Sequence, residues 1–127
     1  MATIIELNQE NYNATVAQDG IVLVDAWAAW CGPCRQFAPI FEKASENYAH
    51  HIFAKLDTEA NKDILSALEI KHIPTLMIYR DGILLYRNAG SPSAEVLADI
   101  ISQVESLDME AVRADIASQE AEKNGSA

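Results

Sequence analysis

Short β-rich segments alternate with helical patterns along most of the chain. Apolar runs at 3–7, 21–26 and 52–57 predict three strands, and the second is almost continuously apolar, as in a strand covered on both faces. Two further runs, 75–79 and 83–88, flank a turn with the sequence Arg-Asp-Gly and predict an antiparallel hairpin. This order predicts an α/β domain with a mixed sheet.

Helical periodicity separates the predicted strands. Short helices are expected from about residue 9 and from about residue 61, and a longer one follows Cys34 and reaches Tyr48. Pro39 lies inside the longer helix and should kink it, because its ring clashes with the carbonyl group one turn earlier. Ser91-Pro92-Ser93 predicts the start of another helix, whose apolar face consists of Val96, Leu97, Ile100, Ile101 and Val104.

The C-terminal segment 107–127 has an acidic, alanine-rich composition of its own. No glycine or proline interrupts residues 93–123, so we predict that the helix runs on to about residue 119, with disorder beyond. We therefore divide the chain into a domain at 1–106 and an acidic helical extension at 107–127 with a disordered end. Three residues form a second apolar stripe that folds back on the domain, meets a partner or stays a solvated overhang: Met109, Val112 and Ile116.

Charge and composition exclude several classes of function for this chain. The 127 residues suffice for one domain, and the net charge of −10 argues against binding nucleic acid or an anionic membrane. No apolar run reaches the roughly 18 residues that span a bilayer. Because the first basic residue is Arg35, no secretion signal is apparent, and we expect a cytoplasmic protein unless a leader was removed before Met1.

Cys31 and Cys34 lie where a predicted strand gives way to a helix. Unpaired N–H groups at a helix N-terminus stabilise a thiolate, so Cys31 is predicted to be the attacking nucleophile and Cys34 the resolving thiol. Two cysteines are too few for a disulfide-stabilised scaffold, and a bridge over two intervening residues constrains the unfolded chain little.

A zinc site that uses the two thiols is the competing interpretation. It would need further ligands from the three histidines, His50, His51 and His72. We expect the adjacent pair to point in divergent directions, which argues against zinc, and we predict no metal site in this chain.

Two other features surround the cysteines in sequence. Asp25 is an acid inside the buried strand, so desolvation should raise its pKa and suit it to accept a proton from Cys34; the alternative is a structural ion pair with Lys55. Ile73-Pro74 precedes the fourth strand, where a cis bond would leave backbone polar groups of Ile73 free for an extended substrate segment. The alternative is an ordinary trans proline.

The segment Trp27-Ala28-Ala29-Trp30-Cys31-Gly32-Pro33-Cys34 resembles the active site of the thioredoxin family. Asp25, Pro39, Lys55, Ile73-Pro74-Thr75 and Gly90 occur at matching intervals, and the resemblance covers residues 2 to about 106. It implies a mixed five-stranded sheet flanked by helices, catalytic roles for Cys31, Cys34, Asp25 and Lys55, and a cis Pro74. It also implies a substrate groove formed by Trp30, Gly32, Pro33, Ile73, Pro74 and Gly90.

Some positions depart from the commonest pattern of the family. His72 stands where a small residue is frequent, Thr58 and Ala89 replace larger apolar groove residues, and Ala26 replaces an aromatic residue. These changes leave the chemistry intact and bear on substrate preference. His72 is expected to be a surface side chain beside the groove, or else a proton-sensitive contact to partners.

The resemblance predicts a protein-disulfide reductase that acts as an electron carrier. Its partners would be disulfide-containing proteins and an NADPH-dependent flavin reductase, and no cofactor is expected in this chain. Two alternatives remain: a disulfide isomerase or oxidase, and a binding or regulatory subunit that holds a partner in the groove.

Overall fold

A computed structural model describes residues 3–125 and contains five strands and five helices in that range. The strands are β1 (Ile4–Glu6), β2 (Ile21–Trp27), β3 (Ile52–Asp57), β4 (Thr75–Arg80) and β5 (Ile83–Ala89). The helices are α1 (Tyr12–Val16), α2 (Gly32–Asn47), α3 (Lys62–Ala67), α4 (Ala94–Glu105) and α5 (Met109–Gly125). No helix within the described range is long and apolar enough to cross a membrane.

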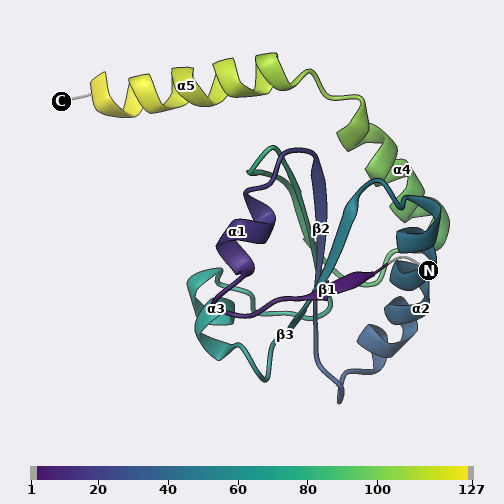
Figure 1. Cartoon of the computed structure of the whole chain (residues 1–127). Helices are drawn as coiled ribbons and strands as arrows, with labels where there is room; N and C mark the ends of the chain where they lie inside the picture. The colour runs from purple at the N-terminus through teal and green to yellow at the C-terminus, as the bar shows by residue number, and fades with distance from the viewer. Residues whose placement is uncertain (1–2, 126–127) are drawn as a thin grey trace.

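The strands form one sheet in the order β1-β3-β2-β4-β5, which confirms the predicted mixed sheet. β1, β3 and β2 are parallel, whereas β4 is antiparallel to both β2 and β5. Helices α1 and α3 cover one face and α2 and α4 the other (Figure 1). β2 is therefore covered on both sides, as its continuous apolar run predicts.

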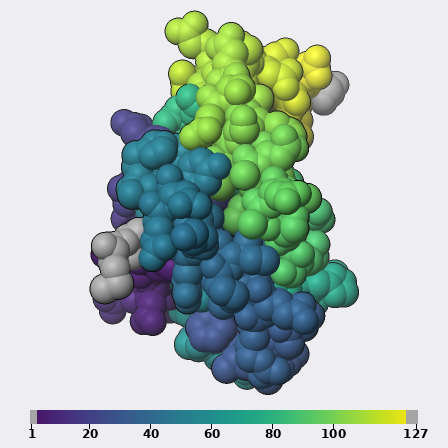
Figure 2. All heavy atoms as spheres, turned by 90° about the vertical axis from the view of Figure 1, so that its right-hand side faces the viewer, coloured from purple at the N-terminus to yellow at the C-terminus, as the bar shows by residue number. Residues whose placement is uncertain are grey.

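Alternate residues of β2 enter two separate cores. Val22 and Val24 face α1 and α3, while Leu23 packs with Phe37 and Phe41 of α2. α2 and α4 lie side by side over the second core, as Figure 2 shows. Asp25 follows Leu23 on this face, so the alternation places a carboxyl group beneath α2.

The turn between β4 and β5 ties several segments together. Asp81 and Gly82 both have positive φ, 54° and 79°, the combination that a two-residue hairpin turn of the I′ type requires. The Asp81 carboxylate accepts a hydrogen bond from the Gly20 N–H at 2.8 Å, and the Asp81 N–H donates to the Gly20 carbonyl at 2.9 Å. The hairpin is thereby joined to the start of β2.

The predicted continuous helix across residue 106 is wrong, because side-chain hydrogen bonds end one helix and begin another. The Arg80 guanidinium donates to the carbonyls of Val104, Glu105 and Leu107 at 2.8, 3.2 and 3.2 Å, which satisfies the last turn of α4. The Asp108 carboxylate then accepts from two N–H groups, those of residues 110 and 111, and starts α5.

α5 continues to Gly125, whereas we predicted disorder after residue 119. Alanine, glutamate and lysine favour helix, and Gln119 donates to Asp115 one turn earlier at 3.3 Å. The last part of the predicted disordered end, residues 126–127, lies outside the described residues. The division of the chain at residue 106 stays a prediction.

The first turns of α5 pack on the domain, and its later turns project from it (Figure 1). Met109 is buried, Val112 and Ile116 are half-buried, and Arg113 pairs with Asp81 at 3.5 Å. Of the three alternatives for the second apolar stripe, the structure supports the first: the N-terminal part of the stripe folds back on the domain.

Truncation after Ser106 is expected to lower thermal stability. It removes the buried Met109 side chain and the Arg113 ion pair, which together contribute about 1–3 kcal/mol. We expect a melting temperature lower by roughly 3–8 °C, measured by circular dichroism. An unchanged melting temperature would show that α5 does not stabilise the domain, and a shift to monomer in sedimentation would show that it joins two copies.

Candidate active site

The two cysteines lie between the end of β2 and the start of α2. Cys31 is the N-cap residue of α2, and its Sγ accepts a hydrogen bond from the Cys34 N–H at 3.2 Å. The side chains form a disulfide across Cα atoms 5.2 Å apart. A reduced Cys31 in this place would have its thiolate stabilised by backbone N–H groups.

A small apolar cluster encloses the sulfur atoms. It consists of both cysteines and Ala28, with Trp27 and Ile73 packed against it. Cys31 and Cys34 are 4% and 3% exposed in the disulfide form, so exposure does not distinguish the two sulfur atoms. Their difference in reactivity must come from the cap position instead.

The peptide bond before Pro74 is cis, as the resemblance implies. The Ile73 carbonyl oxygen lies 3.7 Å from the Sγ of Cys31. The Pro74 carbonyl accepts the Gly90 N–H at 2.8 Å. The structure thus brings Cys31, Ile73, Pro74 and Gly90 together at one end of the sheet, where β2 and β5 end and β4 begins.

Asp25 is fully buried, and its carboxylate has no hydrogen-bond partner among residues 3–125. Burial raises its pKa to about 7, and the nearby charge of Lys55 partly offsets that rise. The alternative of a close ion pair between Asp25 and Lys55 is not supported, because the Lys55 ammonium group pairs with Glu42 and neither Asp25 oxygen has a hydrogen-bond partner among the described residues. The carboxyl group can therefore gain or lose a proton near neutral pH.

Lys55 lies opposite Asp25 in the parallel pairing of β2 and β3, but its ammonium group is turned to other partners. Its Nζ is 4.0 Å from a Glu42 carboxylate oxygen and 5.4 Å from the centre of the Trp27 ring. Sequence patterns did not indicate Glu42 or Trp27 as partners of Lys55, since one is a solvent-facing residue of α2 and the other ends a strand.

Three of the residues predicted for the groove, Trp30, Pro33 and Gly90, are exposed, whereas Gly32 and Ile73 are half-buried and Pro74 is buried. Trp30 is 66% exposed, and its indole N–H donates to the Glu59 carboxylate at 2.8 Å. A Cβ atom added at Gly32 or Gly90 would meet no heavy atom within 4 Å. Gly90 also has φ of +118°, which residues with a side chain rarely adopt. There is room here for an extended segment of another protein.

The positions that depart from the family pattern differ in their placement. His72 is exposed, which confirms the expectation of a surface side chain, and Ala89 is exposed as well. Thr58 is buried, and its hydroxyl donates to the Trp27 carbonyl at 3.1 Å. Thr58 thus binds the last residue of β2 through its hydrogen bond, and its side chain is not available for direct contact with a partner protein.

In the reduced protein, iodoacetamide is expected to modify Cys31 about tenfold or more faster than Cys34, because Cys31 occupies the N-cap position where N–H groups stabilise its thiolate. A brief pulse at pH 7 followed by peptide mass spectrometry measures both thiols in one sample. Equal modification of the two thiols would contradict this assignment.

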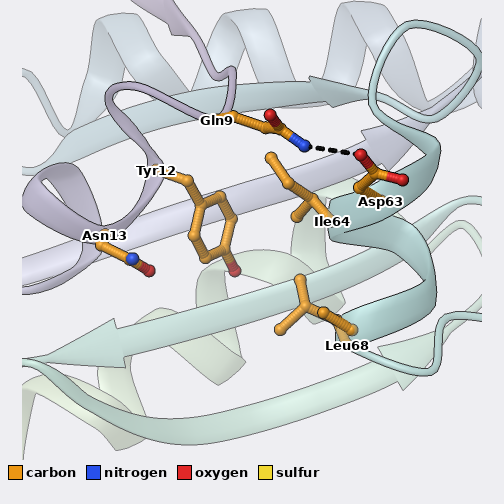
Figure 3. Close-up of a pocket in the computed structure, with 7 residues that line it drawn as sticks. Gln9, Tyr12, Asn13, Asp63, Ile64 and Leu68 are labelled. Atoms are coloured by element: carbon orange, nitrogen blue, oxygen red, sulfur yellow. Dashed lines mark hydrogen bonds between the residues drawn. The ribbon is translucent and has the colours of Figure 1, made fainter.

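A separate hollow of about 400 Å³ lies between α1 and α3 (Figure 3). Tyr12, Ile64 and Leu68 line it, and Gln9 donates to the Asp63 carboxylate across its rim at 2.9 Å. The Tyr12 hydroxyl is hydrogen-bonded to that of Tyr79 at 2.7 Å. This hollow shares no lining residue with the cysteine site.

Sequence comparison identifies the relatives of this chain. The family model described as Thioredoxin matches residues 3–103. A putative thioredoxin 2 from Streptomyces coelicolor is 43% identical over 122 residues, which cover 96% of this chain and 91% of the relative. Thioredoxin-2 from Saccharomyces cerevisiae is 36% identical over 104 residues, 82% of this chain and all (100%) of the relative. The bacterial alignment therefore extends beyond residue 106.

Solved structures agree with the predicted fold. Plasmodium falciparum thioredoxin superposes with a TM-score of 0.72 at 27% identity, covering 79% of this chain and 98% of its own. Malassezia sympodialis thioredoxin has a TM-score of 0.72 at 26% identity and covers 80% and 91%. These matches confirm the five-stranded sheet with flanking helices.

Proposed function

This chain belongs to the thioredoxin family and is a thiol-disulfide oxidoreductase, and we propose that it reduces disulfides in partner proteins through Cys31 and Cys34. The observation that carries the proposal is the cysteine pair at the N-cap of α2, beneath an open surface. The Gly-Pro pair between the cysteines is similar to that of the reducing members of the family.

The first step is attack by the Cys31 thiolate on one sulfur of the partner's disulfide. A mixed disulfide forms, and the partner's other sulfur leaves as a thiolate. The surface of Trp30, Gly32, Pro33, Ile73, Pro74 and Gly90 would hold the partner's chain during this step. The exposed Trp30 ring, fixed by Glu59, supports this role for the surface.

The second step is attack by the Cys34 sulfur on the Sγ of Cys31. The Cys34 proton passes to the Asp25 carboxylate, the bond between Cys31 and the partner's sulfur breaks, and the Cys31–Cys34 disulfide forms. The partner's two sulfurs leave as thiolates and take up protons from the solvent, which completes its dithiol. The partner gains two electrons, and this chain loses two. A pKa of about 7 suits Asp25 to accept this proton, and the charge of Lys55 keeps that pKa from rising further.

Regeneration requires a reductant from outside the chain. We infer that a flavin-containing, NADPH-dependent reductase delivers two electrons to the disulfide, which makes this protein an electron carrier in cellular redox balance. A reducing dithiol and a chain with two cysteines suit the cytoplasm, where thiols are kept reduced.

Insulin reduction driven by NADPH and a flavin-containing thioredoxin reductase tests the proposal. We expect NADPH oxidation and insulin precipitation that require both the reductase and this protein. A chain truncated after Ser106 should keep this activity, because the cysteines and the surrounding surface precede that residue. No turnover by the wild type would favour the binding-module alternative, and efficient reshuffling of scrambled ribonuclease without net reduction would favour an isomerase.

A further inference from the structure

Two histidines and a glutamate meet at the end of the sheet that is remote from the cysteines. Oε2 of Glu105, at the end of α4, lies 2.8 Å from Nε2 of His51 and 3.7 Å from Nε2 of His50. The two imidazole centroids are 4.0 Å apart. The expected divergence of the adjacent histidines is wrong, because residues 50–51 lie in the bend between α2 and β3, where successive side chains need not alternate.

We propose that His50, His51 and Glu105 bind a divalent transition-metal ion, with Zn²⁺ as the best match. Two imidazoles and one carboxylate form a known zinc donor set that leaves the fourth position to water. One ligand atom from each residue lies within 4.8 Å of the others. Donors around tetrahedral zinc stand about 3.3–3.4 Å apart, given bonds of roughly 2.0–2.1 Å, so small rotations of these side chains suffice.

The site is partly prepared for a cation. The His51 side chain is only 10% exposed, and its ring lies nearly parallel to that of Tyr48, at 6°. Exposure of 67% for the His50 side chain leaves that ligand free to adjust.

The surrounding hollow of about 330 Å³ is lined by two further charged residues, Asp19 and Arg80. Asp19 adds a second negative charge near the donors, while the Arg80 guanidinium is engaged by the carbonyls at the end of α4. With Glu105, the fixed charges of this hollow sum to −1, which favours a cation. The volume leaves space for water on the open side of the ion.

This site is independent of the redox chemistry. Gly20 and Ile21 at the start of β2 line the hollow, whereas the cysteines follow the end of the same strand, roughly 20 Å away for a strand of this length. Metal binding here should therefore not depend on whether Cys31 and Cys34 are oxidised.

Isothermal titration of zinc chloride into the disulfide form of the full chain at pH 7.5 tests the proposal, because oxidation prevents zinc from binding to the thiols. We expect one ion per chain and at least tenfold weaker binding in His51→Ala and in Glu105→Gln. His72→Ala is the matched control, since it removes an exposed histidine on another surface, and its affinity should equal that of the wild type. Magnesium chloride should give no binding.

Histidine ring signals in nuclear magnetic resonance locate the ion independently of the variants. Addition of zinc should shift the signals of His50 and His51 and leave those of His72 in place. Absence of binding up to 1 mM zinc, on the order of the weakest useful site, would reduce the cluster to an ion pair and overturn the proposal. Wild-type affinity in His51→Ala, or loss of binding in His72→Ala, would overturn it as well.

Discussion

Replacing Cys31 by serine is expected to lower the rate of insulin reduction at least about 10³-fold, because a hydroxyl at the N-cap is not ionised at neutral pH and cannot attack a disulfide. The fold should persist, since serine is a favourable N-cap residue that can accept the same N–H of Cys34. The variant therefore separates chemistry from structure.

Cys34→Ser is the matched comparison for that variant. It keeps the attacking thiol but lacks the sulfur that resolves the mixed disulfide, so the partner should stay covalently attached to Cys31. Non-reducing electrophoresis after incubation with a disulfide-containing partner should show this adduct for Cys34→Ser and not for Cys31→Ser. An adduct on the Cys31→Ser protein, or turnover by it, would refute the assignment of the two roles.

Replacing Asp25 by alanine is expected to raise stability at alkaline pH and to slow catalysis. The folded protein must keep a fully buried, unpaired carboxylate charged above pH 7, whereas the alanine variant carries no such charge. We expect the free energy of unfolding at pH 8 to rise by roughly 2–4 kcal/mol, after allowing for the small cavity left behind.

The pH dependence of this effect has a defined sign. Folding raises the pKa of Asp25 from 3.8 to about 7, so the folded state holds this proton more tightly than the unfolded chain. The destabilisation is absent below about pH 4, grows between pH 4 and pH 7, and is constant above that. Urea unfolding at pH 4, 6 and 8 should therefore show a widening gap between variant and wild type.

Catalysis should change in the opposite direction from stability. Loss of the proton acceptor for Cys34 is expected to slow insulin reduction by roughly tenfold to a hundredfold. Asp25→Asn is the control for the cavity, because it preserves volume without a titratable group, and it should show the same loss of rate. A variant of lower stability with an unchanged rate would contradict the role proposed for Asp25.

The sequence predicted most of the fold and the site because the relevant information is local. The continuous apolar run of β2 predicted a strand covered on both faces. Asp25 stood out as a candidate site residue because it is the one acid within that run. The Asp-Gly pair at residues 81–82 predicted the hairpin, since only certain residues accept positive φ at both positions. The two cysteines at a strand–helix junction identified the candidate site.

Other features depend on contacts between distant segments, which periodicity does not record. Arg80 ends α4 from across the fold, and a pattern without glycine or proline gave no sign of that break. The hydrogen bond from Trp30 to Glu59 and the meeting of His50 and His51 with Glu105 likewise join residues far apart in sequence. The backbone conformation of the bend after α2, rather than the residue types, brings the two histidine rings together.

The position of α5 has a practical consequence for immobilising the protein. Its first turns rest on the hairpin turn at Asp81, at the end of the sheet opposite the cysteines, and its last turns project away from the domain (Figure 1). A resin, an electrode surface or a fluorophore coupled to those last turns would leave the surface around the cysteines open to solution. The projecting part of the helix, residues 117–125, provides a spacer of about 13 Å, at 1.5 Å per residue, between the support and the domain that carries the cysteines.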